Sequence, residues 1–244
     1  MKNLTTILIL LLACILSSCK DTKDNTKLII ATSADYPPFE YKLKGELTGF
    51  DIDLGIILAQ ELNKEPAFLD MEFSAVLASV QSGIADVAIA TITATDERKK
   101  NFDFSDPYYT ESLAILFPHD SPLLQSTDLA GKKIACQLGT TMELWLKNNA
   151  KDSEIITTDS NPQAVESLKA GHVDGVFIDA IQARAFSQKN PQLAYQVMAQ
   201  ADSGYVIVLK KNSPLKEPIN KALKKLIKQG KINDLKRKYL EIKP

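Results

Sequence analysis

Apolar runs of strand length alternate with segments of helical periodicity through most of this chain. The run LIIATS at 28–33 has the length and composition of a buried strand, and at 51–62 leucine and isoleucine recur on one helical face. Further strands are expected at 66–71, 86–90, 113–117, 133–136, 154–158, 175–178 and 205–209, and further helices at 75–82, 141–148, 162–170 and 181–189. The alternation predicts an α/β architecture. Because the series starts again near Leu113, we expect two α/β units with a cleft between them.

The C-terminal segment, 215–239, also has helical spacing. Its apolar positions recur every three or four residues, and Gly230 interrupts them before a last turn or two. The lysines between them favour a solvated face over a binding surface.

The chain begins with the pattern of a secretory signal, which we assign to residues 1–18. Lys2 precedes an apolar run at 7–16, and small residues lead to Cys19. The tetrad LSSC resembles a bacterial lipobox, in which the cysteine is acylated; ordinary signal cleavage beside an incidental cysteine is the alternative. Residues 19–27 follow as a polar tether. We therefore expect an exported protein, lipid-anchored through Cys19 on the periplasmic or cell-surface side of the membrane.

Composition mainly excludes other classes. A net charge of −1 with 45% hydrophobic and 24% charged residues is ordinary for a soluble globular protein and gives no reason to expect nucleic-acid binding. Cys14 leaves with the signal and Cys19 would carry lipid, so Cys136 has no disulfide partner. His119 and His172 lack metal-ligand spacing, and we expect neither a metal nor a cofactor.

Polar residues follow four of the predicted strands. Ser33, Thr91, Gln137 and Asp179 each come where an apolar run ends. Ligands of α/β sheets bind beyond the carboxyl ends of the strands. We therefore expect these four side chains to reach one cleft.

Arg98 is a candidate receptor for a carboxylate. Its guanidinium offers two parallel donors at the first turn of a predicted helix, and the hydroxyl of Thr93 can add a third. The loop Gly139-Thr140-Thr141 opens another helix, whose free amides also favour an anion. The alternative is that Arg98 only forms an ion pair with Glu97 or Asp106.

Asp179 is a candidate receptor for an ammonium group, assisted by the hydroxyl of Thr91. The alternative, which does not exclude binding, is that it caps the helix that follows. Tyr36 lies in a segment, DYPPFEY, that is too polar and proline-rich for a core. With Phe73 it can offer aromatic faces to an apolar or cationic side chain.

Several motifs together resemble a known family. They are YPPFEY, GELTGFDIDL, ITATDERKKNFDFSDPYY, LAGKKIACQLGTT, LKAGHVDGVFID and INDLKRKYL. In this order, over 28–240, they resemble the extracytoplasmic amino-acid-binding proteins of ABC importers, in the group that includes arginine-binding and lysine/arginine/ornithine-binding proteins. The resemblance implies the type II periplasmic-binding-protein fold, with lobe 1 from 28–110 and 206–244, lobe 2 from 111–205, and a hinge between the lobes. It also implies a monomer that delivers its ligand to a membrane permease.

The resemblance implies roles for particular residues as well. Arg98, Thr93 and Thr141 correspond to the α-carboxylate site, and Thr91 and Asp179 to the α-ammonium site. The side-chain pocket would contain Ser33, Tyr36, Phe73, Gln137 and Met142, with Glu40 nearby.

Two departures from the family pattern bear on the ligand. Basic and glutamine-binding members have an aspartate at the position of Ser33, and several have glutamine at that of Met142. Because the Tyr36 and Phe73 pair and the QLGT motif are similar to those of arginine-binding members, we expect arginine or another basic amino acid, with glutamine or a similar polar amino acid as the alternative.

Two other function classes share this fold: an enzyme similar to cyclohexadienyl dehydratase, and a sensory module. The enzyme needs a general acid beside the leaving group. The sequence offers no cleft histidine and no second acid beside Asp179. We therefore expect a transport binding protein and not an enzyme, with a free-standing sensor as the alternative.

Overall fold

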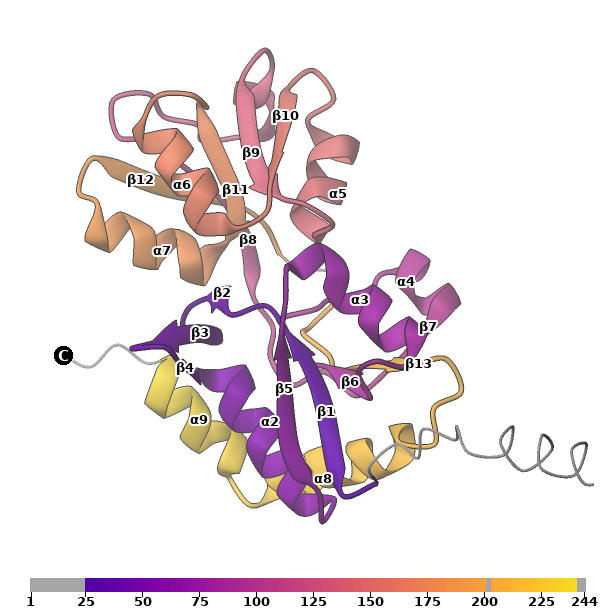
Figure 1. Cartoon of the computed structure of the whole chain (residues 1–244). Helices are drawn as coiled ribbons and strands as arrows, with labels where there is room; N and C mark the ends of the chain where they lie inside the picture. The colour runs from indigo at the N-terminus through magenta and orange to yellow at the C-terminus, as the bar shows by residue number, and fades with distance from the viewer. Residues whose placement is uncertain (1–24, 201–202, 241–244) are drawn as a thin grey trace, which may run out of the picture.

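Two five-stranded sheets with helices on both faces form the two halves of the molecule (Figure 1). The computed structural model describes residues 25–200 and 203–240, so the predicted signal at 1–18 and Cys19 lie outside the described residues. Within those described ranges, no helix is long and apolar enough to cross a bilayer. The predicted α/β class is confirmed.

The first sheet has the strand order β5-β1-β6-β13-β7. Its strands are β1 (Lys27–Thr32), β5 (Glu65–Asp70), β6 (Val87–Ala88), β7 (Phe102–Phe104) and β13 (Val208–Lys210). β1 runs parallel to β5 and β6, whereas β13 is antiparallel to β6 and β7. The chain therefore builds most of this sheet, leaves for the other half and returns to complete it.

Successive side chains of β1 supply two separate cores. Leu28 and Ile30 belong to the core beneath α2 (Phe50–Glu61), α8 (Lys216–Lys228) and α9 (Lys231–Tyr239), whereas Ile29 and Ala31 contact the core beneath α3 (Phe73–Ser82). Because both faces of this strand are covered, its sequence is a continuous apolar run and not an alternating one.

The second sheet has the strand order β10-β9-β11-β8-β12. Its strands are β8 (Ser112–Pro118), β9 (Lys133–Gln137), β10 (Glu154–Thr158), β11 (Gly175–Asp179) and β12 (Leu193–Gln200). β9 is parallel to β10 and β11, while β8 is antiparallel to β11 and β12. One core lies against α5 (Thr141–Asn149), and the other against α6 (Asn161–Lys169) and α7 (Ala180–Lys189).

Two chain segments, 105–111 and 203–207, connect the halves side by side. Tyr205 forms β-bridges with Thr93 and Tyr109, and its N–H donates to the Tyr109 carbonyl at 2.7 Å. Two adjacent crossings are the usual construction of a hinge between domains. The exact lobe boundaries at 110/111 and 205/206 stay a prediction.

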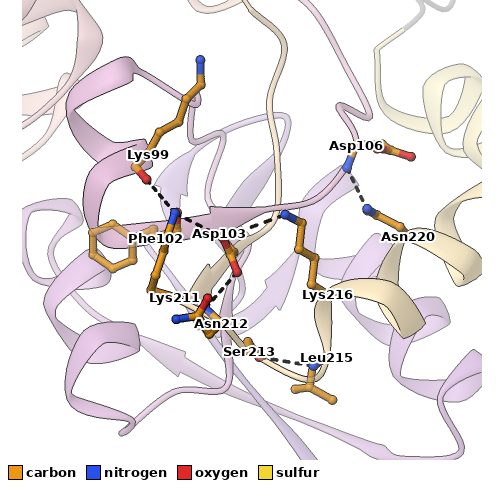
Figure 2. Close-up of polar contacts among 10 residues, drawn as sticks. All are labelled: Lys99, Phe102, Asp103, Asp106, Lys211, Asn212, Ser213, Leu215, Lys216 and Asn220. Atoms are coloured by element: carbon orange, nitrogen blue, oxygen red, sulfur yellow. Dashed lines mark hydrogen bonds and ion pairs between the residues drawn. The ribbon is translucent and has the colours of Figure 1, made fainter.

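The returning chain is fastened to β7 (Figure 2). The carboxylate of Asp103 accepts the N–H of Asn212 at 2.9 Å and lies 3.5 Å from Lys211 Nζ and 3.9 Å from Lys216 Nζ. These contacts hold the turn after β13 and the start of α8 against the sheet edge.

Several strands depart from the sequence prediction. β2 (Asp35–Tyr36), β3 (Glu40–Leu43) and β4 (Glu46–Thr48) form a small antiparallel sheet that the pattern does not predict, and β7 and β12 are also absent from it. These strands are short or half-buried, so they lack an apolar run. The strand expected at 205–209 begins only at Val208, because Tyr205 is part of the crossing segment. A 3₁₀ turn, η1 (Ser126–Leu129), completes the elements.

Candidate functional site

A small cavity lies where strand ends from both sheets meet. Its volume is about 20 Å³, roughly the room that one water molecule needs. It is lined by Tyr36, Phe73, Thr91, Thr93, Arg98, Gln137, Thr140, Thr141, Met142, Asp179 and Tyr205. Nine of the eleven predicted ligand residues are therefore brought together here; Ser33 and Glu40 do not line the cavity.

Arg98 reaches the cavity from α4 (Asp96–Asn101), a short helix that Thr95 caps through a 3.2 Å hydrogen bond to the Arg98 N–H. Its guanidinium donates to the carbonyl oxygens of Thr93, at 2.9 Å, and of Gly139, at 2.8 Å. Thr93 follows the first sheet and Gly139 follows the second, so this one side chain joins the two halves.

The expected alternative partners of Arg98 are engaged elsewhere. Glu97 pairs with Lys100 at 2.5 Å, and Asp106 with Lys224 at 3.3 Å. Burial lowers the pKa of Arg98 to about 10, so it remains cationic at neutral pH. Within the part of the chain that the structure describes, this cation is held by neutral carbonyl groups alone, an arrangement that favours an incoming anion.

The second element at this end of the cavity is the start of α5. Thr140 caps the helix by accepting the Glu143 N–H at 3.4 Å, and Thr141 begins the first turn. Backbone N–H groups of a first helical turn have no partner inside the helix and carry a partial positive charge. Arg98 and the start of α5 thus present donors to one space from opposite sheets.

Asp179 supplies a negatively charged group to the same cavity and is buried, with only 3% of its surface exposed. Its carboxylate accepts the hydroxyls of Tyr36 and Tyr205, the latter at 2.7 Å. Asp179 occupies the N-cap position of α7, yet its side chain makes no capping hydrogen bond. Burial raises its pKa to about 7. The side chain therefore faces the cavity and the tyrosines, not the helix.

The remaining walls are mostly apolar. Phe73 and Met142 are each less than a tenth exposed and lie on α3 and α5. Gln137, at the end of β9, donates its amide N–H to Asp35 Oδ2 at 3.1 Å and to the Asp159 carbonyl at 2.9 Å. This part of the site thus combines the apolar faces of Phe73 and Met142 with the polar Gln137, which is bonded to an acid, Asp35.

Asp35 lies beside Ser33, and neither residue lines the cavity. The Ser33 hydroxyl donates to Asp35 Oδ1 at 3.3 Å, and both residues line a neighbouring surface hollow of about 340 Å³. Burial raises the pKa of Asp35 to about 6. The acid that is missing at residue 33 is thus present two residues later, bonded to the cavity residue Gln137.

Glu40 lies behind the cavity. Its side chain is only 1% exposed, and its Oε1 accepts the hydroxyl of Thr91 at 3.3 Å. The Thr91 hydroxyl therefore belongs to two environments, the cavity on one side and a buried carboxyl on the other.

The profile of the bacterial extracellular solute-binding proteins, family 3, matches residues 28–242. The chain belongs to this family.

Relatives of this solute-binding protein bind different amino acids. It is 34% identical to the arginine-binding extracellular protein ArtP of Bacillus subtilis, over 96% of both chains. It is 31% identical to the L-cystine-binding protein TcyJ of Escherichia coli strain K12, over 89% of this chain and 84% of that one. A solved ancestral arginine-binding protein with bound arginine superposes with a TM-score of 0.85 at 37% identity, over 88% of this chain and 99% of that one. The two-lobe periplasmic-binding-protein fold is confirmed.

One residue of the cavity wall in this solute-binding protein, Tyr205, has no counterpart among the residues that the sequence singles out, while Thr140 and Asp35 are noticed there without a place in the ligand site. Tyr205 opens an apolar run that indicates only a strand, and its contact with Asp179 depends on how the chain crosses between the lobes. The strand-to-helix signal Gly139-Thr140-Thr141 was available for Thr140. Nothing in the local pattern separates Asp35 from an ordinary turn aspartate.

Metal and thiol chemistry receive no support from the described residues. Among them, no group of three or more His, Cys, Asp or Glu side chains could hold a metal ion. Cys136 is fully buried on β9, and burial raises the pKa of its thiol to about 12. A neutral thiol of this kind is a small core residue and not a nucleophile.

Proposed function

We propose that this protein binds a free α-amino acid, most favourably arginine, between its lobes and delivers it to an ABC transporter permease. One observation carries the proposal. Within residues 25–200 and 203–240, the cavity has a cation without a carboxylate partner, Arg98, and a buried carboxylate without a cationic partner, Asp179. A zwitterion satisfies both groups at once.

In this proposal the α-carboxylate binds Arg98, Thr93 and the amides at Thr141. The α-ammonium group binds Asp179 and the hydroxyl of Thr91. The ligand groups would replace the carbonyl of Gly139 at Arg98 and the hydroxyls of Tyr36 and Tyr205 at Asp179. Binding thus exchanges hydrogen bonds to neutral partners for bonds between two oppositely charged groups.

The side-chain end supports a basic ligand. Tyr36, Phe73 and Met142 provide apolar and aromatic faces, and Asp35 lies beside Gln137. A long cationic side chain suits aromatic walls with an acid at the end. The arginine-binding relatives support the same choice, while the cystine-binding relative requires that other amino acids be tested.

Location and molecular class form part of the proposal. We infer a signal at 1–18, a lipid anchor on Cys19, a tether at 19–27 and a monomer that catalyses no reaction. The family description, extracellular solute-binding proteins, supports export. The lipobox-like LSSC sequence supports the anchor.

The test is thermal unfolding of protein stripped of ligand by unfolding and refolding, measured with each of the twenty amino acids, ornithine and cystine. A ligand at a hundred times its Kd adds about 2.7 kcal/mol to the free energy of unfolding, or roughly 5–10 °C in Tm at this size. Arginine is expected to give the largest shift.

Two neighbouring cations on α4 provide a matched control. Arg98→Ala is expected to abolish the shift, whereas Lys99→Ala, which removes only a solvent-exposed pair with Asp96, is expected to leave it intact. A shift with glutamine or cystine alone would replace arginine but keep the class. No shift with any ligand would refute the proposed function.

A further inference from the structure

Two carboxyl groups lie directly behind the cavity residue Thr91. Glu40 comes from β3 and Asp51 from the first turn of α2. Their exposed fractions are 1% and 0%. Two buried acids in contact are unfavourable for folding unless their charge and hydrogen bonds are satisfied, so each oxygen has to be accounted for.

Three donors reach this pair. The N–H of Thr91 donates to Asp51 Oδ2 at 2.9 Å, and the Tyr108 hydroxyl donates to the same oxygen at 2.8 Å. The Thr91 hydroxyl donates to Glu40 Oε1 at 3.3 Å. Both acids therefore bind Thr91, one through its backbone and one through its side chain.

The other two oxygens need a proton between them. Glu40 Oε2 and Asp51 Oδ1 meet no N–H or hydroxyl donor among the described residues, and the two carboxyls lie within hydrogen-bonding reach of each other. Burial, followed by the charge of Asp51, raises the pKa of Glu40 well above its usual range, while burial raises the pKa of Asp51 to about 6. The rise in pKa is larger at Glu40, which favours the proton on Glu40, from where it can be donated to the Asp51 carboxylate.

Thr91 is held in an unusual backbone conformation. Its φ is +49°, which is rare for a β-branched residue and persists only where the surroundings enforce it. The two hydrogen bonds to Asp51 and Glu40 supply that enforcement.

We propose that Glu40 and Asp51 are positioning residues that turn the Thr91 hydroxyl proton away from the cavity, so that Oγ1 presents its lone pairs to the ligand ammonium group. The inference rests on the proposed function and extends it to two residues outside the cavity wall. A hydrogen-bonded chain runs from the ammonium group through Thr91 and Glu40 to the buried charge of Asp51. Such a chain polarises each of its members in the same direction.

The chemistry predicts an unusual order of variants. Gln is isosteric with protonated Glu: its N–H can donate to Asp51 and its carbonyl can accept the Thr91 hydroxyl. Glu40→Gln should therefore retain arginine affinity within about twofold. Glu40→Met, of similar size but without polar atoms, should weaken arginine binding about tenfold, as expected for losing a hydrogen bond to a charged group.

Comparing two ligands distinguishes an effect on the orientation of the Thr91 hydroxyl from a general effect on folding. Calorimetric Kd values would be measured for arginine and for 5-guanidinopentanoate, which is arginine without its α-amino group. Glu40→Met should weaken arginine binding and leave 5-guanidinopentanoate unchanged. Asp103→Asn, a carboxylate that only fastens β7 to the returning chain (Figure 2), is the control and should change neither ligand.

Two further variants keep the test decisive. In a Thr91→Val background, Glu40→Met should have no additional effect on arginine binding, and this cycle decides the matter even if 5-guanidinopentanoate binds too weakly to measure. If Glu40→Met does not fold, Asp51→Asn replaces it in the test, because removing a buried charge is compatible with folding. Asp51→Asn should weaken arginine binding and leave 5-guanidinopentanoate binding unchanged, because it removes the charge at the end of the hydrogen-bonded chain.

Several results would overturn the inference: equal weakening of both ligands, additive effects in the cycle, or unchanged arginine binding in both Glu40→Met and Asp51→Asn. Absence of arginine binding to the unmodified protein would instead count against arginine as the ligand. The two failures are therefore distinguishable.

Discussion

Replacing Asp179 by asparagine should stabilise the protein in the absence of ligand while it removes ligand binding. The carboxylate is buried and is approached by two hydroxyls, but within the described residues no cation pairs with it. Asparagine keeps an oxygen that accepts from Tyr205 and removes the buried charge. Residues that are shaped for a ligand are often destabilising in its absence.

The stability that Asp179→Asn should gain can be calculated from the pKa of Asp179. Burial raises the pKa of Asp179 to about 7, a value that already includes the lowering effect of the two tyrosine hydroxyls. In the unfolded chain the pKa is about 3.9. Each pKa unit corresponds to about 1.36 kcal/mol, so the charged side chain costs up to about 4 kcal/mol above pH 7.

The upward direction of the Asp179 pKa shift determines the pH range in which stability changes. Between about pH 4 and 7 the folded protein retains the proton that the unfolded chain has released, so stability falls as pH rises through this range. Below pH 4 both states are protonated and the cost disappears. Asp179→Asn should thus gain stability over the parent at pH 8 and show almost no difference at pH 4.

The assay is urea unfolding of ligand-stripped parent and variant at several pH values from 4 to 8, with arginine titrations alongside. Asp103→Asn is the control for removing a carboxylate away from the cavity. A variant that is less stable than the parent at pH 8, or a difference that does not change with pH, would contradict this account of Asp179. Retained arginine affinity in the variant would refute its role as the ammonium receptor.

Three further predictions concern Asp179, Gly49 and Asp103. Because protonated Asp179 must lose its proton to bind an ammonium group, arginine affinity should fall by up to about tenfold per pH unit below pH 7; calorimetry that gives the same Kd at pH 5 and pH 8 would exclude this coupling. Gly49→Ala should lower the free energy of unfolding by more than about 2 kcal/mol, since φ at Gly49 is +128° and a Cβ would lie 2.1 Å from the Phe39 carbonyl oxygen. Denaturant unfolding measures this change, and an unchanged free energy would show that the start of α2 can shift. Asp103→Asn should lower the free energy of unfolding by about 1 kcal/mol, because it weakens the hydrogen bond to Asn212 and two partly exposed lysine pairs. The Kd for arginine should not change. A larger loss of stability in denaturant unfolding would mean that this attachment is needed for folding.

Much of the fold can be predicted because its determinants are local. The apolar runs on β1, β9 and β11 are buried on both faces, so periodicity and length alone identify them. α3 ends at Ser82, where its predicted range also ends, and Gly83 follows in the left-handed conformation that glycine adopts readily. The strands that were missed, such as β12, are half-buried and carry no such signal.

The site residues likewise fall into those with a local sequence signal and those without one. Arg98 and Asp179 stand at the junctions of predicted strands and helices, where the topology of an α/β sheet directs side chains to a cleft. The bonds from Gln137 to Asp35 and from Tyr36 to Asp179 join residues 102 and 143 positions apart. No local pattern encodes contacts that depend on how two lobes meet. For this reason the role of Tyr205, the bond between Asp35 and Gln137 and the placement of Glu40 required the structure.

The size of the cavity connects binding to movement of the lobes. Ligand pockets usually have volumes of about 300–1,000 Å³, whereas this one has about 20 Å³. An amino acid can enter only if the lobes separate, and separation must break the bonds that join them. Among the described residues, four such side-chain hydrogen bonds run from Arg98 to Gly139, from Gln137 to Asp35, from Gln182 to Pro37 and from Tyr36 to Asp179.

Three of these four bonds use groups that we assign to the ligand. Arg98 and Asp179 each hold a neutral partner from the opposite lobe in the place of a charged ligand group, and Gln137 holds Asp35 beside the side-chain end. A ligand therefore does not simply add contacts to a closed form; it competes with the internal partners for the same donors and acceptors. The affinity is the difference between the ion pairs that the ligand forms and the hydrogen bonds to neutral partners that it displaces. A ligand lacking its α-carboxylate or its α-ammonium group should therefore bind more weakly than arginine.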